Sequence, residues 1–351
     1  MRKIRAAIVG YGGMGHWHGE HILWDKEKYI LSGIYDIDPD RCRLAEKEGI
    51  KVYGSFEELL ADESVELVTV AAYNEVHKEI AIAAMNSGKN VISEKPVTLS
   101  VKSLDEMIAV SEKTGKMFTV HQNRRWDSDF LTAKRIVENN VLGNTFRIEH
   151  RVQGSRGIPR DWRSHKEHGG GMVYDWGVHL IDQILTLYDH VKLTSVYANL
   201  THVTNSECDD GCYITLTFEN GATVFLEVTT NNFISLPSWY ILGENGTAVI
   251  ENWELDGKIV MVEDWENADA VPVQMGQGLT KTMAPRNDDS IKEYELPKEI
   301  GDWGGFYDNI YDVLVKDEKQ LVTHRQIKRC LTVIEGVFKS AELNQVIYTE
   351  I

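Results

Sequence analysis

Three glycines near the start of the chain constrain its fold more than any other feature. Gly10, Gly12 and Gly15 form the pattern G-x-G-x-x-G directly after the apolar run Ile4–Val9, and Gly13 lies between the last two. The first glycine permits a tight turn, the second lets a phosphate approach the backbone, and the third lets a helix pack close to the strand. The pattern therefore predicts a strand, a turn and a helix whose free N–H groups bind a dinucleotide pyrophosphate.

An acidic residue at the end of the next predicted strand indicates which dinucleotide binds. Asp36 follows the run Tyr29–Tyr35, where a carboxylate can accept hydrogen bonds from the adenosine ribose. That carboxylate repels a 2′-phosphate, and Asp38 adds a second negative charge, whereas Arg41 and Arg43 are the only cations nearby in the sequence. We therefore expect NAD rather than NADP. The residues of this region expected to hold it are Gly10, Tyr11, Gly12, Gly13, Met14, Gly15 and Asp36.

The first third of the chain alternates short apolar runs with amphipathic segments. The expected strands are Ile4–Val9, Tyr29–Tyr35, Leu67–Ala72, Asn90–Ser93 and Met117–His121. The expected helices are His18–Trp24, Pro39–Glu48, Ser55–Leu60, His77–Asn86 and Val101–Thr114, the last with Ser100 as N-cap and Gly115 as C′ residue. This alternation predicts an α/β Rossmann domain, with a parallel sheet covered on both faces, over residues 1–122.

The alternation of short strands and helices ends at about Asn123. A helix over Ser128–Asn139 precedes stretches rich in Thr, Val, Tyr and Phe, and two helices end the chain. The expected strands are Thr145–Gln153, Leu193–Val203, Tyr213–Phe218, Ala222–Thr230, Trp239–Leu242 and Ala248–Ile250, and the last helices are Phe306–Val315 and His324–Leu343. Asn220-Gly221 and Asn245-Gly246 predict hairpin turns with positive φ at both residues. We expect residues 123–351 to form an α+β domain with a large, mostly antiparallel sheet, and Asn267–Ser290 to be a loop.

Charge and cysteine content exclude several classes of protein. The net charge is −17 over 351 residues, which argues against binding nucleic acid or an anionic membrane surface. The four cysteines are too few for a disulfide scaffold, and no apolar run has the length of a signal or transmembrane segment. We expect a cytoplasmic protein with reduced thiols.

Later motifs make the chain similar to a known family. These motifs are the opening glycines, Glu94-Lys95-Pro96, and Gly169-Gly170-Gly171 followed by Asp175-Trp176-Gly177-Val178-His179. With the motifs in the same order, the chain resembles the Gfo/Idh/MocA oxidoreductases over almost its whole length. Ala72–His77 is similar to the family's Thr-Pro-Asn…His loop, with Ala-Tyr in place of Thr-Pro. The stretch Gln122–Trp126 is similar to members that act on scyllo-inositol and other polyols. His18 also matches a family histidine.

The resemblance implies a general organisation for the enzyme. Its active site would lie between the two domains. The sheet of the second domain, whose proposed roles are substrate binding and oligomerisation, would pack against a partner subunit to give a homo-oligomer: a dimer, a tetramer or a larger assembly.

Lys95 is a candidate catalytic residue on chemical grounds. It follows the strand Asn90–Ser93, and open α/β sheets bind ligands at the carboxyl ends of their strands. Pro96 restricts the backbone of Lys95 and so fixes where its amine points. An ammonium group held there can stabilise the alkoxide that forms as hydride leaves carbon, and it can relay a proton.

Asp175 and His179 are the other two candidate catalytic residues. If Asp175 begins a helix, the two side chains lie on one face, and Asp182 extends the same stripe. A neighbouring carboxylate would raise the basicity of the imidazole and fix its orientation. We therefore expect His179 to be the general base and Asp175 to orient it or the substrate, while Asp182 is the weaker candidate.

Further residues are expected to contact the ligands. Trp162-Arg163 precedes the glycine triplet, and in related proteins such a pair reaches the cofactor or substrate, while indole rings can stack on the C–H faces of a sugar. Additional cofactor contacts are expected from Ala72, Asn74, His77, Glu94, Lys95, Gln122, Trp162 and Arg163. Substrate contacts are expected from Lys95, Asn123, Arg124, Arg156, Trp162, Asp175, Trp176 and His179.

Two constellations resemble metal sites, but we expect no metal at either. His16, His18 and His21 lie in the first helix, where contact with the cofactor or substrate is the better interpretation. Cys208 and Cys212 have no second cysteine pair, which disfavours a structural zinc site.

The leading hypothesis is a NAD-dependent dehydrogenase acting on a secondary hydroxyl group of a sugar, glycoside or cyclitol. Scyllo-inositol and a glucoside oxidised at C3 both remain open as substrates. An alternative is a hydrolase or lyase that retains NAD and cleaves a glycosidic bond through transient sugar oxidation. A non-catalytic sensor would have no need of Lys95, Asp175 and His179 together.

Overall fold

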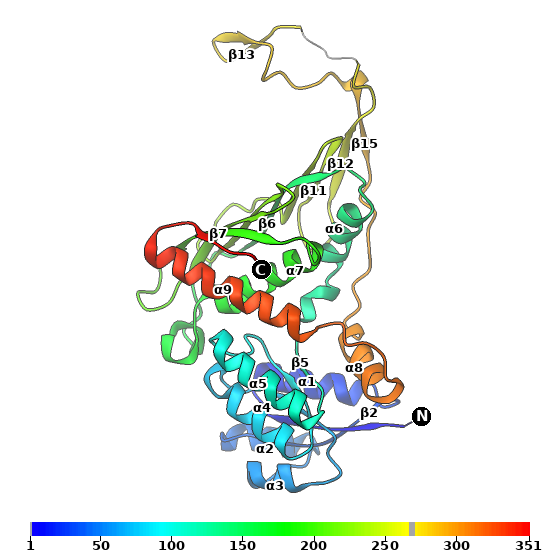
Figure 1. The fold of residues 1–351 in the computed structure, drawn as a ribbon, viewed down its shortest axis with the longest axis vertical. Helices are drawn as coiled ribbons and strands as arrows, with labels where there is room; N and C mark the ends of the chain where they lie inside the picture. The colour runs from blue at the N-terminus through cyan, green and yellow to red at the C-terminus, as the bar shows by residue number, and fades with distance from the viewer. Residues whose placement is uncertain (1, 267–270) are drawn as a thin grey trace.

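The N-terminal half is built on a parallel sheet of five strands (Figure 1). The computed structural model describes residues 2–266 and 271–351. The strands β1 (Ile4–Val9), β2 (Tyr29–Tyr35), β3 (Leu67–Val70), β4 (Asn90–Ser93) and β5 (Phe118–Val120) have the order β2-β1-β3-β4-β5. Every neighbouring pair is parallel. The strands β1, β3 and β5 are almost wholly buried, as a sheet covered on both faces requires, whereas the edge strand β2 is only partly buried. The predicted Rossmann fold is confirmed.

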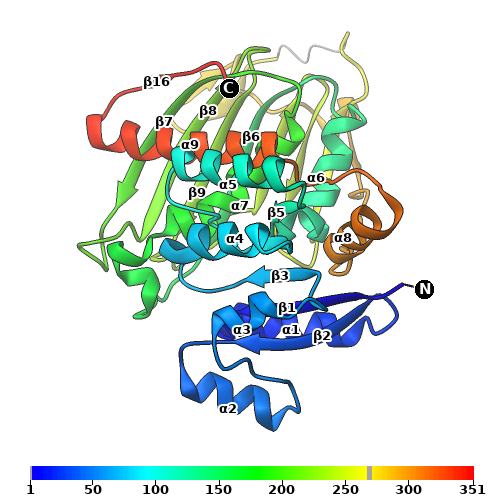
Figure 2. The same cartoon turned by 60° about the horizontal axis from the view of Figure 1, so that its bottom comes forward.

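Five helices connect these strands. They are α1 (Gly13–Trp24), α2 (Pro39–Lys47), α3 (Phe56–Ala61), α4 (His77–Asn86) and α5 (Val101–Thr114), and α4 and α5 lie side by side (Figure 2). The predicted caps of α5 are confirmed: the Ser100 side chain accepts a hydrogen bond from Ser103 N–H, and Gly115 is left-handed at φ 65°. The predicted start of α1 at His18 was wrong, because the helix already begins inside the glycine turn.

The C-terminal half is built on a mixed sheet of nine strands. Its order is β15-β12-β11-β10-β6-β9-β8-β7-β16, and all pairs are antiparallel except β6 and β9. The strands are β6 (Thr145–Gln153), β7 (Leu193–Thr201), β8 (Gly211–Phe218), β9 (Thr223–Thr229), β10 (Trp239–Gly243), β11 (Gly246–Ile250), β12 (Gly257–Val262), β15 (Ile291–Tyr294) and β16 (Ile347–Tyr348). The predicted fold class of this half is therefore confirmed too.

The structure corrects two sequence predictions in this half. Both Asn-Gly hairpins form, but among their four residues only Gly221 has a positive φ, at 86°. Asn220 instead accepts a hydrogen bond from Ala222 N–H within a longer turn. The region 267–290 is not purely a loop, because β13 (Val273–Met275) and β14 (Gly278–Thr280) form a separate hairpin; residues 267–270 lie outside the described residues.

Helices α6 (Ser128–Glu138), α7 (Val178–Leu187) and α9 (His324–Leu343) cover one face of the large sheet (Figure 1). The helix α8 (Gly305–Lys316) instead packs on the N-terminal half, where the backbone carbonyl of its buried Tyr307 accepts a hydrogen bond from Tyr29 Oη at 2.6 Å. We retain the domain division after residue 122 as a proposal. Among the described residues, none of the helices has both the length and the apolar character needed to cross a membrane.

Candidate functional site

The glycine turn between β1 and α1 has the shape that a dinucleotide needs. A Cβ added to Gly15 would lie 1.9 Å from the Gly10 carbonyl oxygen, so this glycine is required for the helix to pack against the turn. Gly10 itself has φ 88°, a conformation that favours glycine. Gly13 has no neighbouring atom within 4 Å of such a Cβ, and the N-cap residue Gly12 offers no side-chain cap. The open space beside Gly13 and the uncapped first turn of α1 therefore fit a pyrophosphate.

Asp36 lies beside this turn, after β2. Its carboxylate accepts hydrogen bonds from the backbone N–H groups of Tyr11 at 2.5 Å and Asp38 at 2.8 Å. The guanidinium group of Arg41 is 3.4 Å from Asp36, and it also lies 3.4 Å from where a Cβ on Gly12 would stand. The predicted acid is thus at the turn, but one of the two nearby cations is there as well.

Lys95 and Asp175 meet between the two halves of the molecule. The Nζ atom of Lys95, which follows β4, is 2.7 Å from the backbone oxygen of Asp175 and 3.1 Å from its carboxylate. Arg163 Nε donates to the other carboxylate oxygen at 2.8 Å. These two cations lower the pKa of the Asp175 carboxyl group, against the opposing and largest single effect of burial. The structure therefore joins three of the predicted site residues in one ion-pair network.

His179 is next to this network but is not bonded to it. The imidazole is buried on α7, and its Nδ1 atom has no hydrogen-bond partner within the described part of the chain. Burial holds the pKa of His179 well below 6.5, and the positive charges of Lys95 and Arg124 depress it further. The imidazole is consequently neutral at neutral pH and keeps a lone pair with which to accept a proton.

The expectation that Asp175 raises the basicity of His179 was wrong. Residues Val173–Gly177 form a π turn that leads into α7. The carboxylate of Asp175 already has two charged partners, Lys95 Nζ at 3.1 Å and Arg163 Nε at 2.8 Å. The carboxylate of Asp175 is therefore directed to Lys95 and Arg163, not to the imidazole.

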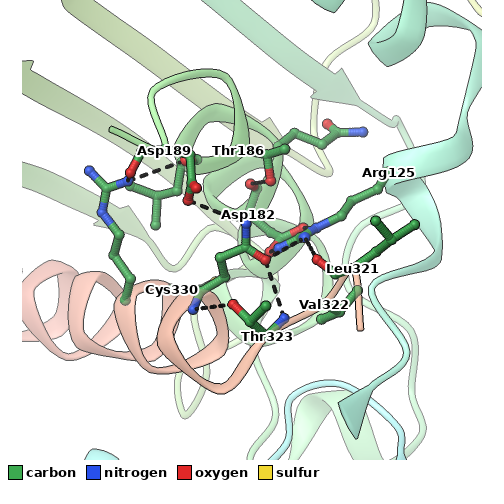
Figure 3. Close-up of polar contacts among 12 residues, drawn as sticks. Arg125, Asp182, Thr186, Asp189, Leu321, Val322, Thr323 and Cys330 are labelled. Carbon is green, nitrogen blue, oxygen red and sulfur yellow. Dashed lines mark hydrogen bonds and ion pairs between the residues drawn. The ribbon is translucent and has the colours of Figure 1, made fainter. Parts of the chain in front are cut away.

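Asp182 is three residues further along α7 than His179, in a second network with Arg125 (Figure 3). Its carboxylate accepts two hydrogen bonds from Arg125, from Nε at 2.7 Å and from Nη2 at 2.6 Å. Arg125 Nη1 also donates to the Leu321 carbonyl oxygen and to Gln326 of α9. This buried pair ties the single turn Asn123–Trp126 to the helix that carries His179, so its role is to position the site.

Two indole rings flank Arg124, and the sequence singled out only one of them. The guanidinium carbon lies 4.1 Å from the ring of Trp176 and 5.4 Å from that of Trp253. The Trp176 ring is in turn 6.1 Å from the imidazole of His179. Trp253 was missed because it is far away in sequence. An apolar ring within the polar turn Asn252–Asp256 was the available signal.

Several predicted cofactor residues support the site from within the protein. The carboxylate of Glu94 is buried and bonded to His18 at 2.8 Å, to His121 at 2.7 Å and to the backbone N–H of Lys95 at 3.0 Å. His18 is wholly buried, so the structure does not place it facing a ligand. One ligand atom from each of His18, Glu94 and His121 lies within 4.8 Å of the others, and hydrogen bonds account for that arrangement.

The loop after β3 is also internally braced. The ring nitrogens of the buried His77 lie 3.0 Å from the carbonyl oxygens of Pro96 and Ala72. Asn74 donates to the carbonyl oxygens of His168 at 3.0 Å and Gly169 at 3.2 Å, and so links the two halves beside the glycine triplet.

The other predicted residues are less closely connected to the network. Gln122 is buried, Asn123 is half-buried, and Arg156 is exposed on the loop after β6. Arg163 lies 4.5 Å over the ring of Trp162, which is half-buried. Cys208 and Cys212 are both buried free thiols.

Comparison with known proteins identifies both halves of the chain. Residues 4–122 match the family described as oxidoreductase family, NAD-binding Rossmann fold (GFO_IDH_MocA), and residues 130–249 match the GFO/IDH/MocA C-terminal domain. An NAD-binding protein from Listeria innocua has a similar structure, with a TM-score of 0.95 at 42% identity, covering 99% of this chain and 100% of that one.

Two curated relatives are more distant. An uncharacterised oxidoreductase of Schizosaccharomyces pombe is 30% identical over 84% of this chain and 83% of its own. A protein of Bacillus subtilis named scyllo-inositol 2-dehydrogenase (NADP(+)) is 30% identical over 61% of this chain and 60% of its own.

Proposed function

Because the chain belongs to the Gfo/Idh/MocA family of oxidoreductases, we propose that it oxidises a secondary hydroxyl group of a sugar, glycoside or cyclitol with NAD. The observation that carries the proposal is the contact of Lys95 Nζ with Asp175, next to a buried, neutral His179. A positive charge and a proton acceptor side by side are what alcohol oxidation needs, since the hydroxyl proton and a hydride both leave the substrate. The inositol dehydrogenases among the distant relatives support a polyol substrate.

The bound nicotinamide would supply the hydride acceptor. His179 accepts the hydroxyl proton on a ring nitrogen, because burial keeps its imidazole neutral. Lys95 stabilises the developing alkoxide, and Asp175 holds the Lys95 ammonium and the Arg163 guanidinium in place. Around these groups, we assign substrate contacts to Asn123, Arg124, Arg156, Trp162 and Trp176, as their positions in the sequence predict.

We propose NAD as the preferred cofactor. The carboxylate of Asp36 stands where it would repel a 2′-phosphate, and its two backbone donors hold it in that position. Arg41, 3.4 Å from Asp36, reduces this repulsion but does not remove it, since the same guanidinium also pairs with Asp38 at 3.6 Å. The Bacillus relative is named for NADP, so this preference separates the two proteins.

We also propose that the protein is cytoplasmic, which is consistent with its four unpaired cysteines.

We further propose that it forms a homo-oligomer. The face of the large sheet opposite α7 and α9 carries no helix within the described residues (Figure 1), and it exposes aromatic side chains. Tyr213 and Phe225 stack there at 6.3 Å. Light scattering on a sizing column tests this: a monomer would contradict it.

A substrate screen tests the proposed activity. Purified protein is mixed with NAD and with inositols, hexoses or aryl glucosides, and NADH absorbance is followed. We expect NADH to accumulate with at least one of these polyols. No NADH with any of them contradicts the proposal, and glycoside cleavage with tightly retained NAD would establish the hydrolase or lyase alternative instead.

A further inference from the structure

A cluster of three side chains lies beside the proposed base. It consists of Trp176, Arg124 and Trp253 and is here called the indole cluster; the Trp176 ring is 6.1 Å from the His179 ring, and the Arg124 guanidinium carbon is 4.1 Å from Trp176 and 5.4 Å from Trp253. The rings of Trp176 and Trp253 are 6.3 Å apart at 47°. Among the described residues, Trp176 has a ring contact with His179, whereas Trp253 has no ring contact with His179. Trp253 is therefore the member that lies farther from the proposed base.

Trp253 is exposed and yet held in place. About half of the side chain, 49%, is accessible to solvent. Its turn is fixed by the neighbouring Asn252, whose side-chain oxygen accepts hydrogen bonds from the backbone N–H groups of Glu254 and Asp256 and whose amide donates to the Asp256 carboxylate at 2.9 Å. An indole that is exposed on a fixed turn is preorganised to bind a ring, because little conformational freedom is lost on binding.

Arg124 adds hydrogen-bond donors to this surface. In the described parts of the chain, only its Nη1 atom donates a hydrogen bond, to the Asp127 carboxylate at 2.8 Å. The Nε and Nη2 donors are therefore available to a ligand at this surface. Guanidinium donors next to aromatic faces suit a molecule that combines rings with oxygen acceptors.

From this geometry we propose that Trp253 and Arg124 form a subsite for the second ring of a glycoside substrate. The inference rests on the proposed function and narrows it, because a free cyclitol has one ring and no second ring to place on Trp253. The sugar ring that reacts lies at Lys95 and His179, next to Trp176. The aglycone ring lies on Trp253, and Arg124 donates a hydrogen bond to the oxygen atoms between the two rings.

Substrates with one and two rings test the subsite. The wild type, Trp253→Ala and Trp253→Phe are compared on 4-nitrophenyl β-glucoside, methyl β-glucoside and scyllo-inositol, each with NAD. We expect Trp253→Ala to raise KM for the nitrophenyl glucoside about three- to tenfold, the usual size of a stacking contact, with kcat unchanged. KM for the one-ring substrates stays constant, and Trp253→Phe restores most of the loss. Trp303→Ala, which removes another exposed indole, is the matched control.

Calorimetric titration of the NADH-loaded proteins with the same three compounds separates two kinds of failure. Equal losses on one-ring and two-ring compounds, or a wild type that binds no nitrophenyl glucoside while oxidising inositol, would overturn the subsite and leave the proposed function standing. Binding that is selective for the nitrophenyl glucoside, without oxidation of any compound, would support the subsite and overturn the proposed function.

Discussion

Removing one partner of the Arg125–Asp182 pair should destabilise the protein strongly. Both side chains are almost completely buried, and the carboxylate accepts two hydrogen bonds from the guanidinium group (Figure 3). Within the described part of the chain, Asp182→Ala leaves the Arg125 guanidinium group with hydrogen bonds to Gln326 and to the Leu321 carbonyl oxygen, and neither of these partners carries a negative charge. Breaking such a pair costs about 3–5 kcal/mol. For a chain of this size we expect the melting temperature to fall by roughly 4–7 °C.

The same substitution should weaken catalysis without touching the cofactor. Asp182 lies on the helix that carries His179, and Arg125 directly follows Arg124 in the turn beside it. Loss of the pair lets these two elements shift relative to each other, so we expect kcat/KM to fall while NADH affinity remains constant. Scanning calorimetry and steady-state kinetics measure the two effects.

Asp189→Ala is the comparison variant, because its carboxylate pairs at 2.5 Å with the exposed Arg325 and has only a longer contact, 3.3 Å, with Gln326 of the buried network. A surface pair contributes about 0–1 kcal/mol. The double variant Arg125→Met, Asp182→Leu should recover most of the stability, since it leaves no unpaired buried charge. If Asp182→Ala costs no more than Asp189→Ala, the positioning role argued for this network is refuted.

Three further predictions concern the cofactor turn and the buried base. Gly15→Ala should prevent folding or lower stability severely, because its Cβ would overlap the Gly10 carbonyl, whereas Gly13→Ala should fold normally and lose NADH affinity. Circular dichroism tests the folding of both variants and fluorescence titration tests their NADH affinity. Equal NADH affinity of Gly13→Ala and the wild type would contradict the prediction. The unfolded chain should bind a proton at His179 before the folded chain does, because burial depresses the folded pKa below 6.5, so stability is lost as pH falls through 6.5. Between pH 7.5 and 5.5, His179 should lower the free energy of unfolding by about 1.4 kcal/mol. Urea unfolding measures this loss, which should be absent in His179→Gln. An identical pH dependence of stability in both proteins would refute the assignment. Asp36→Ala should reduce the preference for NAD over NADP in kcat/KM. A wild type whose kcat/KM with NADP equals that with NAD would contradict the proposed cofactor preference.

Local sequence signals predicted the N-terminal half well. The bounds of β1, β2, β4, α4 and α5 match the predictions, because their apolar patterns and capping residues are local properties. The strands β12, β15 and β16 were missed. Of these, β15 and β16 have four residues or fewer and pair with strands distant in sequence, whereas β12 forms a local hairpin with β11. The Asn-Gly turns show the opposite error, because a local preference for positive φ yielded to the surrounding contacts.

The sequence predicted candidate residues for the site better than it predicted the contacts among them. The structure brings Lys95 and Asp175 into contact, whereas the sequence pattern paired Asp175 with His179. No spacing rule foresees that the Asp175 carboxylate pairs with Lys95 and Arg163, which are distant from it or outside its helix. The approach of Trp253 to Trp176 could not be predicted either, because it depends on how the turn after β11 packs over the start of α7.

The most direct test of the account is the rate of NADH formation by Lys95→Ala and His179→Ala beside the wild type, on whichever polyol the screen identifies. We predict that each variant loses about 10²- to 10⁴-fold in kcat, because each removes a group that acts on the proton or the charge of the reacting oxygen. Fluorescence titration should show that both still bind NADH as the wild type does. A rate like that of the wild type in either variant, with NADH binding intact, would contradict the proposed chemistry for that residue.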